Sequence, residues 1–245
     1  MSEHTRDGTG VHASDKGVKD APQEPQGGPP RPLVEEWTQG TNLTPEHPLG
    51  RLMGQERWCV WRWVRKGSGK WTKKPERPAP EGQGWGLATN KPGEGRSYEA
   101  ARAAVLRGDA DGVGWLLLGE PELVWLDLDK CRDVKTGVLD PWATAVLQRI
   151  GKCYMELTPS GTGVRAVGKA EDIPHEGQTR VDIRRVLAGA GPYQIAEWGG
   201  VREAREGAAI EVFHNCARFV TVTGAWSQLT MPGGTRRPTP GKAGL

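Results

Sequence analysis

The stretch Val124-Trp125-Leu126-Asp127-Leu128-Asp129 is an apolar run that ends in two acids separated by one residue. In a β-strand, residues i and i+2 point to the same face, so we expect Asp127 and Asp129 side by side on a half-buried sheet. Two neighbouring carboxylates repel each other, and a hard divalent cation such as Mg²⁺ between them relieves that repulsion. The alternative is a strand that runs into a solvated acidic turn, which is the commoner context of an Asp-x-Asp triplet.

The chain of 245 residues is long enough for one good-sized domain or two small ones with a buried core. Its formal net charge of +3 is unevenly distributed. Residues 1–49 hold four basic and eight acidic residues, and the remainder holds 29 basic and 22 acidic residues. The remainder therefore carries about +7, which favours polyanionic partners. An ordinary basic surface could also carry a charge of this size.

No stretch has the apolar length of a transmembrane helix, and Met1-Ser2-Glu3-His4 does not begin a signal peptide. The sequence therefore predicts a cytoplasmic protein without membrane contact. Its four cysteines are widely spaced and include no Cys-x-x-Cys pair, which argues against a zinc ribbon and against a disulfide framework.

Composition divides the chain into three parts. Residues 1–50 are rich in Gly, Pro, Gln and charge, with few residues that could offset the entropy lost on ordering, so we expect a disordered arm. Residues 51–226 should form the folded domain. Residues 227–245, which include Gly233-Gly234 and Pro238-Thr239-Pro240-Gly241, should form a flexible C-terminal tail.

Within the domain, the residue pattern predicts both helices and strands. One helix should begin after Ser97 as N-cap and end at Gly108, and a second should have Asp140 as N-cap and Pro141 at its first position. Residues 112–118 and 123–129 should form a hairpin through Gly119-Glu120-Pro121, while residues 179–187 are compatible with strand or helix. Further strands are expected over 58–64, 153–157, 164–167, 210–213 and 218–224.

Residues 57–77 combine eight basic residues, one acid and four tryptophans. Basic groups interleaved with aromatic rings suit a nucleotide or a single strand, because charge holds phosphate and rings stack on bases. Trp61 and Trp63, which share one strand face, are more typical of a core than of a stacking surface. Lys73 and Lys74 are the better candidates for contact with phosphate.

Two other features carry candidate site residues. The loop Thr158-Pro159-Ser160-Gly161-Thr162-Gly163 could bring backbone amides against a phosphate, although most such loops are only turns. It lacks the spacing of a Walker or dinucleotide motif. Glu211 is an acid within an apolar strand, which requires an arginine partner or a cation. It is either an ion-paired residue or a third metal ligand beside Asp127 and Asp129.

The order of these motifs resembles the primase-polymerase domain of phage and plasmid replication proteins in the archaeo-eukaryotic primase superfamily. The resemblance covers most of residues 57–226 and rests on four separate motifs in the family's order. These are Trp58 and Trp61 with Gly69 to Pro75, then Asp127 to Cys131, then Pro159 to Gly163, then Glu211-Val212-Phe213 with Arg218 to Gly224.

The resemblance implies an α+β fold with a primase-type palm, a mixed or antiparallel sheet flanked by helices. It implies that Asp127, Asp129 and Glu211 hold divalent metal, Mg²⁺ or Mn²⁺, and that the second motif faces the nucleotide's triphosphate through Ser160, Gly161, Gly163 and Arg165. Arg218 is expected near the nucleotide. Lys73 matches a lysine of the leading motif, for which we expect phosphate or template contact.

Arg165 departs from the family, whose second motif usually ends in His. An arginine still offers charged, forked donors to phosphate. It cannot readily donate a proton, because its pKa is too high. If the family's His transfers a proton, this chain would be slow or inactive.

We therefore expect a DNA primase/polymerase that acts on a single-stranded DNA template and nucleoside triphosphates by a two-metal mechanism. A separate replicative helicase is an expected partner. Asp127→Ala and Asp129→Ala should each abolish synthesis without unfolding the domain. The alternatives are a metal-dependent phosphodiesterase and a catalytically weakened nucleic-acid-binding module of a replication or defence system.

Overall fold

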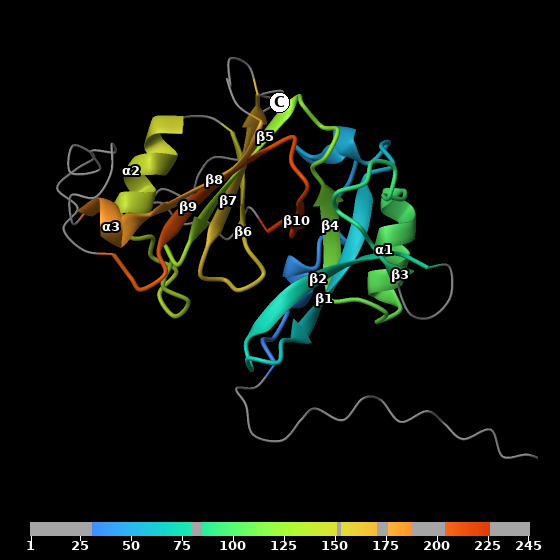
Figure 1. Ribbon diagram of the computed structural model, residues 1–245, viewed down its shortest axis with the longest axis horizontal. Coiled ribbons are helices and arrows are strands. Elements are labelled where there is room, and N and C mark those ends of the chain that lie inside the picture. The colour runs from blue at the N-terminus through green and yellow to red at the C-terminus, as the bar shows by residue number, and fades with distance from the viewer. Residues whose placement is uncertain (1–30, 80–84, 151–152, 171–175, 188–203, 226–245) are drawn as a thin grey trace, which may run out of the picture. The chain divides into compact units, whose positions relative to one another are not determined.

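The computed structural model describes residues 31–79, 85–150, 153–170, 176–187 and 204–225. They form an α+β fold with two five-stranded sheets, both antiparallel, and few helices (Figure 1). The expected α+β class and the antiparallel pairing are confirmed, but the strands are divided between two sheets. The primase-type palm stays a prediction.

The first sheet has the strand order β10-β4-β1-β2-β3 and carries the basic and aromatic stretch. The segment that precedes β1 in the chain contains the short 3-10 helices η1 (Glu36–Thr38) and η2 (Gly50–Leu52). Helix α1 (Tyr98–Leu106) packs against β1 and β4, and the Ser97 hydroxyl accepts from the Ala100 N–H at 3.2 Å, as the expected N-cap requires. The strands are β1 (Trp58–Arg65), β2 (Trp71–Arg77), β3 (Trp85–Gly86), β4 (Gly112–Leu116) and β10 (Phe219–Val222).

The second sheet has the order β6-β7-β5-β9-β8 and carries the predicted acids. Helix α2 (Pro141–Ile150) begins at the expected proline, and with α3 (Ile183–Leu187) it shares a hydrophobic core with one face of this sheet. Residues 179–187, which were compatible with strand or helix, are divided between β8 and α3. The strands are β5 (Leu123–Asp129), β6 (Tyr154–Leu157), β7 (Val164–Lys169), β8 (Gly177–Asp182) and β9 (Ala209–His214).

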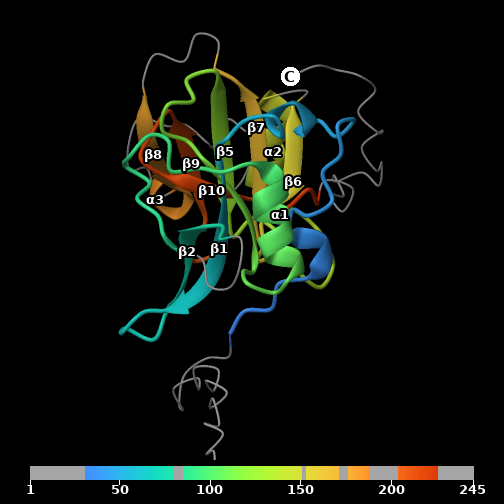
Figure 2. The same cartoon turned by 90° about the vertical axis from the view of Figure 1, so that its right-hand side faces the viewer.

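The segment that contains β10 joins the two sheets. Thr221 pairs with Gly114 of β4, and the backbone N–H groups of Thr223 and Gly224 donate to Glu156 on β6. One hydrophobic core also includes residues of both sheets, among them Trp115 of β4 and Trp125 of β5. Figure 1 shows β10 between β4 and the strands of the second sheet, and Figure 2 gives the view turned by 90°.

The prediction that residues 112–118 and 123–129 form a hairpin is wrong. β4 pairs with β1 and β10, whereas β5 pairs with β7 and β9, so the connection crosses from one sheet to the other. Arg57 approaches this connection, donating to the carbonyls of Leu118 (2.8 Å) and Gly119. The turn residues were identified correctly, but a turn does not determine which sheet the next strand joins.

The predicted domain boundary at residue 51 is too late. Residues 31–50 are part of the described fold, and Leu43, Leu49 and Thr38 in this segment are buried. Residues 1–30 of the predicted arm and the predicted tail at 227–245 lie outside the described residues. In the parts of the chain that the structure describes, no helix is long and apolar enough to cross a bilayer.

Candidate active site

Five charged residues form a row across the second sheet, one on each strand. Register places Glu156 opposite Arg165, Arg165 opposite Asp127, Asp127 opposite Glu211, and Glu211 opposite Arg180. Residues directly opposite across antiparallel strands point to the same face, so the five side chains share one face of the sheet. Asp129, two residues beyond Asp127, lies on this face as well.

The predicted ligand Asp127 is held by Arg165. Arg165 Nε donates to Asp127 Oδ1 at 2.5 Å and Nη2 donates to Oδ2 at 2.6 Å, a bidentate pair. Arg165 is only 3% exposed, and its Nη1 donates to the Thr221 carbonyl and, at 2.8 Å, to Thr221 Oγ1. Burial is the largest single effect and acts to lower the pKa of Arg165, but the charge and hydrogen bonds of Asp127 together with the charges of Glu156 and Asp129 outweigh it. The pKa is raised, so the arginine stays charged.

A buried acid that the sequence reasoning missed lies next to Arg165. Glu156 is fully buried, and its Oε2 accepts from Tyr154 OH at 2.9 Å and from two backbone N–H groups of the β10 segment. Its Oε1 lies 3.9 Å from Arg165 Nη1. Burial raises the pKa of Glu156, and Arg165 opposes that rise. Glu156 lies within an apolar strand, the same signal that identified Glu211.

The other two predicted acids share a second arginine. Arg180 Nη1 donates to Glu211 Oε1 at 2.6 Å and to Asp129 Oδ2 at 3.3 Å. Burial raises the pKa of Asp129, the charges of Asp127 and Glu211 raise it further, and Arg180 opposes them. The three acids are therefore close enough to repel one another. Arg180 was not predicted, because its segment was compatible with two kinds of secondary structure.

Lys73, on β2 of the first sheet, belongs to the same electrostatic cluster. Burial, followed by the Arg165 charge, lowers the pKa of Lys73 to about 8, while Asp127, Asp129 and Glu211 act to raise it. Its Nζ lies 5.5 Å from the centre of the Trp63 ring, which packs edge-on to the buried Trp61. The charges of the acids on the second sheet thus act on a lysine of the first sheet.

Lys74, the second predicted phosphate contact, lies on the opposite face of β2. Adjacent strand residues alternate between faces. Lys74 Nζ lies 3.3 Å from Glu76 Oε1, while the other oxygen of Glu76, Oε2, pairs with Arg62. The structure therefore does not bring Lys74 to the acids. Its contact with phosphate stays a prediction for a different surface.

The predicted phosphate loop lies beside the end of β5 that carries Asp129. Arg132 Nη1 donates to the Gly161 carbonyl at 2.9 Å, and Ser160 Oγ lies within hydrogen-bonding distance of the Thr158 and Thr162 hydroxyls. Gly161 has φ of +69°, which favours glycine. Ser160 is exposed. The loop is thus at the same end of the sheet as Asp129, and its binding of triphosphate stays a prediction.

Arg218 reaches the acids through an intermediate residue. Its Nε donates to Gln178 Oε1 at 2.8 Å, and Gln178 Nε2 donates to Glu211 Oε1 at 3.3 Å. Arg218 is exposed. Its guanidinium therefore lies one hydrogen-bonded residue away from Glu211.

The donor set suits a divalent metal by chemical type, since carboxylates are the protein ligands that Mg²⁺ and Mn²⁺ prefer. The side chains are not arranged as a finished metal site, however. In the described ranges, no group of three or more His, Cys, Asp or Glu residues is placed to hold a metal ion. Asp127 is occupied by Arg165, and Asp129 and Glu211 are occupied by Arg180.

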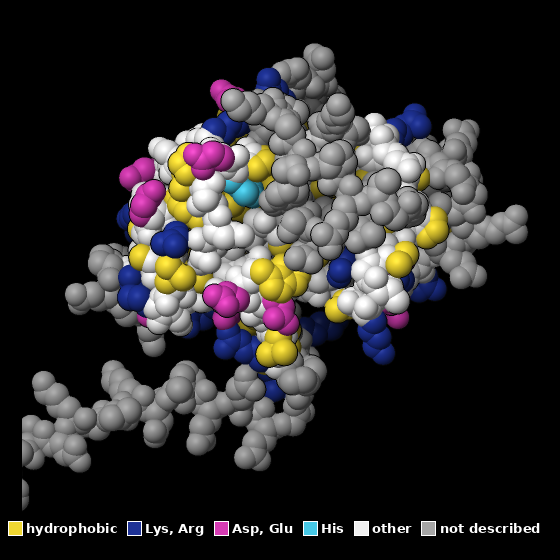
Figure 3. All heavy atoms as spheres, turned by 180° about the vertical axis from the view of Figure 1, so that it is seen from behind, with side chains coloured by type: hydrophobic (Ala, Val, Ile, Leu, Met, Phe, Trp, Pro, Cys, Tyr) yellow, Lys and Arg dark blue, Asp and Glu magenta, His cyan; other side chains and the backbone are white. Residues whose placement is uncertain are grey.

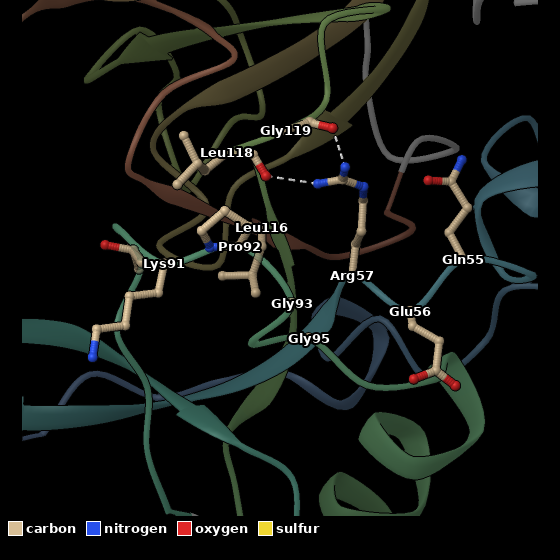
Figure 4. A pocket seen from close by; sticks show the side chains of 11 residues that line it. Gln55, Glu56, Arg57, Lys91, Pro92, Gly93, Gly95, Leu116, Leu118 and Gly119 are labelled. Carbon is tan, nitrogen blue, oxygen red and sulfur yellow. Dashed lines mark hydrogen bonds between the residues drawn. The ribbon is translucent and has the colours of Figure 1, made fainter.

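Two surface pockets lie elsewhere. The pocket in Figure 4, about 250 Å³, is lined by Arg57, Lys91, Leu116 and Gly119 among others, and a second is lined by Thr41, Tyr98 and Arg102 among others. The first contains an arginine that is already bonded to backbone carbonyls, and neither contains a predicted site residue. We place the site at the acids because three predicted ligands share one sheet face there, whereas each pocket is lined by a single acid, Glu56 or Glu99.

On the face of the molecule in Figure 3, basic and acidic side chains of the described residues are interspersed, and the hydrophobic ones form small separate groups. The excess of basic residues in the sequence therefore does not gather into one continuous patch among the described residues of this face. Interspersed charge of this kind is typical of an ordinary solvated surface.

No protein-family model matches the chain. The chain is similar to a DNA primase-polymerase of Nitratiruptor phage NrS-1, with 29% identity over 170 residues, which is 68% of this chain and 19% of the phage protein. The chain thus spans about a fifth of the length of that relative. The similarity supports a relationship to primase-polymerases.

Proposed function

We propose that the chain catalyses template-directed nucleotidyl transfer, as a DNA primase/polymerase acting on single-stranded DNA and nucleoside triphosphates. The observation that carries this proposal is the direct opposition of Asp127 and Glu211 across β5 and β9, with Asp129 beside them and Lys73 in their field. The phage relative supports the same class of reaction. A separate replicative helicase partner also belongs to the proposal, on the resemblance of the sequence motifs alone.

Asp127, Asp129 and Glu211 would hold the divalent metal, Mg²⁺ or Mn²⁺. When bound, the metal would supply Lewis acidity for a 3′-hydroxyl that attacks the α-phosphate and for the pyrophosphate that leaves. Arg165 fixes the orientation of the Asp127 carboxylate by the bidentate pair. We therefore assign Arg165 first to positioning Asp127, and contact with the triphosphate would require it to exchange a buried ion pair for phosphate.

The remaining cations and the loop would bind the nucleotide. Lys73 is mostly protonated at pH 7 with a pKa of about 8, so it can attract a polyphosphate next to the acids. Ser160, Gly161 and Gly163 would approach the phosphates from the end of β5, and Arg218 from beyond Glu211. In this proposal the chain's own residues orient the triphosphate and balance its charge.

Primer synthesis and extension on single-stranded DNA test this function. Asp129→Asn and Glu211→Gln remove a charge from side chains that are 38% and 17% exposed, so the fold should persist. Activity should fall on the order of 100-fold or more. Glu122→Gln, at the other end of β5 and exposed, is the matched control and should retain activity. Circular dichroism checks the fold of each variant. Full activity of both site variants would exclude the proposed roles.

One observation favours a second candidate, a nucleic-acid-binding module of low catalytic activity. All three acids are already paired with arginines, as they would be in a site that had lost its metal. Salt-sensitive binding of single-stranded DNA without nucleotide incorporation would favour this candidate. If the protein shortened labelled single-stranded DNA in the presence of metal and without triphosphates, it would instead be a phosphodiesterase.

A further inference from the structure

The two arginines that pair with the acids differ in how firmly they are held. Arg165 lies on an internal strand, is 3% exposed and uses three nitrogens in hydrogen bonds. Arg180 lies on the edge strand β8, its side chain is 46% exposed, and one nitrogen, Nη1, makes both of its contacts with the acids. A buried ion pair is costly to break by removing one partner, whereas an exposed pair contributes little to stability.

Arg180 Nη1 lies between two of the predicted metal ligands. It bridges one oxygen of Asp129 and one of Glu211, and each of these oxygens belongs to a carboxylate assigned to the metal. A positive group between two carboxylates is what a divalent ion would replace. The guanidinium is therefore a stand-in cation, supplied by the chain itself.

We propose that Arg180 is an exchangeable counter-ion, which a divalent cation must displace from Asp129 and Glu211. This inference rests on the proposed function, because it takes these acids as metal ligands. Arg180 is a positioning residue: it neutralises the acids before the metal binds, and its departure opens the site. Arg165, by contrast, stays on Asp127 throughout.

The exchange predicts that replacing Arg180 raises the affinity for metal, which a merely structural role would not do. Removing Arg180 eliminates both the ion pair that the metal must break and the repulsion between the guanidinium and the metal. Arg180→Gln should therefore bind Mn²⁺ about three- to tenfold more tightly than the native chain. A side chain that only supported the fold would, when replaced, weaken metal binding or leave it unchanged.

Calorimetric titration of the full chain with Mn²⁺ alone, without nucleotide or DNA, measures this effect. Arg184→Gln is the matched control, because it removes the same charge from an exposed position four residues away on α3. It should bind Mn²⁺ as the native chain does. Arg180→Lys keeps the charge and should stay closer to the native affinity than Arg180→Gln.

A Glu211→Gln variant separates failure of this inference from failure of the proposed function. If Glu211→Gln loses Mn²⁺ binding but Arg180→Gln binds it no more tightly than the native chain, the exchange is refuted and the metal site stands. If neither the native chain nor Arg180→Gln binds Mn²⁺, the metal site of the proposed function is refuted, and the exchange falls with it. A gain in Arg180→Gln that Arg184→Gln equals would also refute the exchange, since net charge alone would explain it.

Discussion

At the scale of single residues, neighbouring acids of one motif have different tasks. Asp127 and Asp129 are separated by one residue and share a face, yet Asp127 is 8% exposed and held by Arg165, whereas Asp129 is partly exposed and shares Arg180 with Glu211. The first carboxylate is therefore part of the interior of the fold. The second lies at its rim, where a cation can approach.

This difference revises the expectation that both Asp→Ala variants leave the domain folded. Asp127→Ala leaves the buried Arg165 without its main partner and should lower the free energy of unfolding by about 3–5 kcal/mol. Asp129→Ala should change it by roughly 0–1 kcal/mol. Urea unfolding followed by circular dichroism measures both values.

A double variant provides the control. Asp127→Leu combined with Arg165→Met removes both charges, so it should recover much of the stability lost in Asp127→Ala. Equal unfolding midpoints for Asp127→Ala and Asp129→Ala would contradict the assignment of Asp127 to the interior.

At the scale of elements, the loop 158–163 and the strand β7 must approach β5 closely. A methyl group at Gly163 would lie 2.8 Å from the Leu128 carbonyl oxygen and 2.9 Å from Thr158 Oγ1, both closer than van der Waals contact. Only glycine lets β7 begin alongside β5 at this point. The same register then places Arg165 opposite Asp127.

Gly163→Ala should therefore lower the free energy of unfolding by about 1–3 kcal/mol, since the extra methyl group forces the backbone apart. Gly168→Ala, near the other end of β7, is the matched control, because a methyl group there meets no atom within 4 Å. That variant should be neutral or slightly more stable. Thermal or urea unfolding distinguishes the two, and equal stabilities would contradict the close approach.

At the scale of the whole described fold, the environment of Lys73 depends on both sheets. Lys73 is on β2, whereas Arg165, Asp127, Asp129 and Glu211, which act on its charge, are on the second sheet. Its lowered pKa is therefore a property of the packed fold and should disappear when the sheets separate.

Labelling with an amine-reactive reagent tests this environment, because only the neutral amine reacts. With a pKa of about 8, Lys73 should reach half of its maximal labelling rate near pH 8, whereas an ordinary lysine does so above pH 10. Mass spectrometry resolves the site, and the exposed Lys66 serves as internal reference. In denaturant the labelling rate of Lys73 should depend on pH as that of an ordinary lysine does. A midpoint of the labelling rate above pH 10 in the folded protein would contradict the lowered pKa.

Local features of this protein were determined by the sequence alone. Ser97 caps α1, Pro141 begins α2, and alternation within β5 puts Asp127 and Asp129 on one face, because each depends on residues within a few positions of one another. Which strands pair and which arginine each acid contacts were decided only by the tertiary structure. The separation of β4 from β5 and the pairing of the acids with Arg165 and Arg180 depend on strands distant in the chain, whose order follows from the packing of whole faces and leaves little trace in any local pattern.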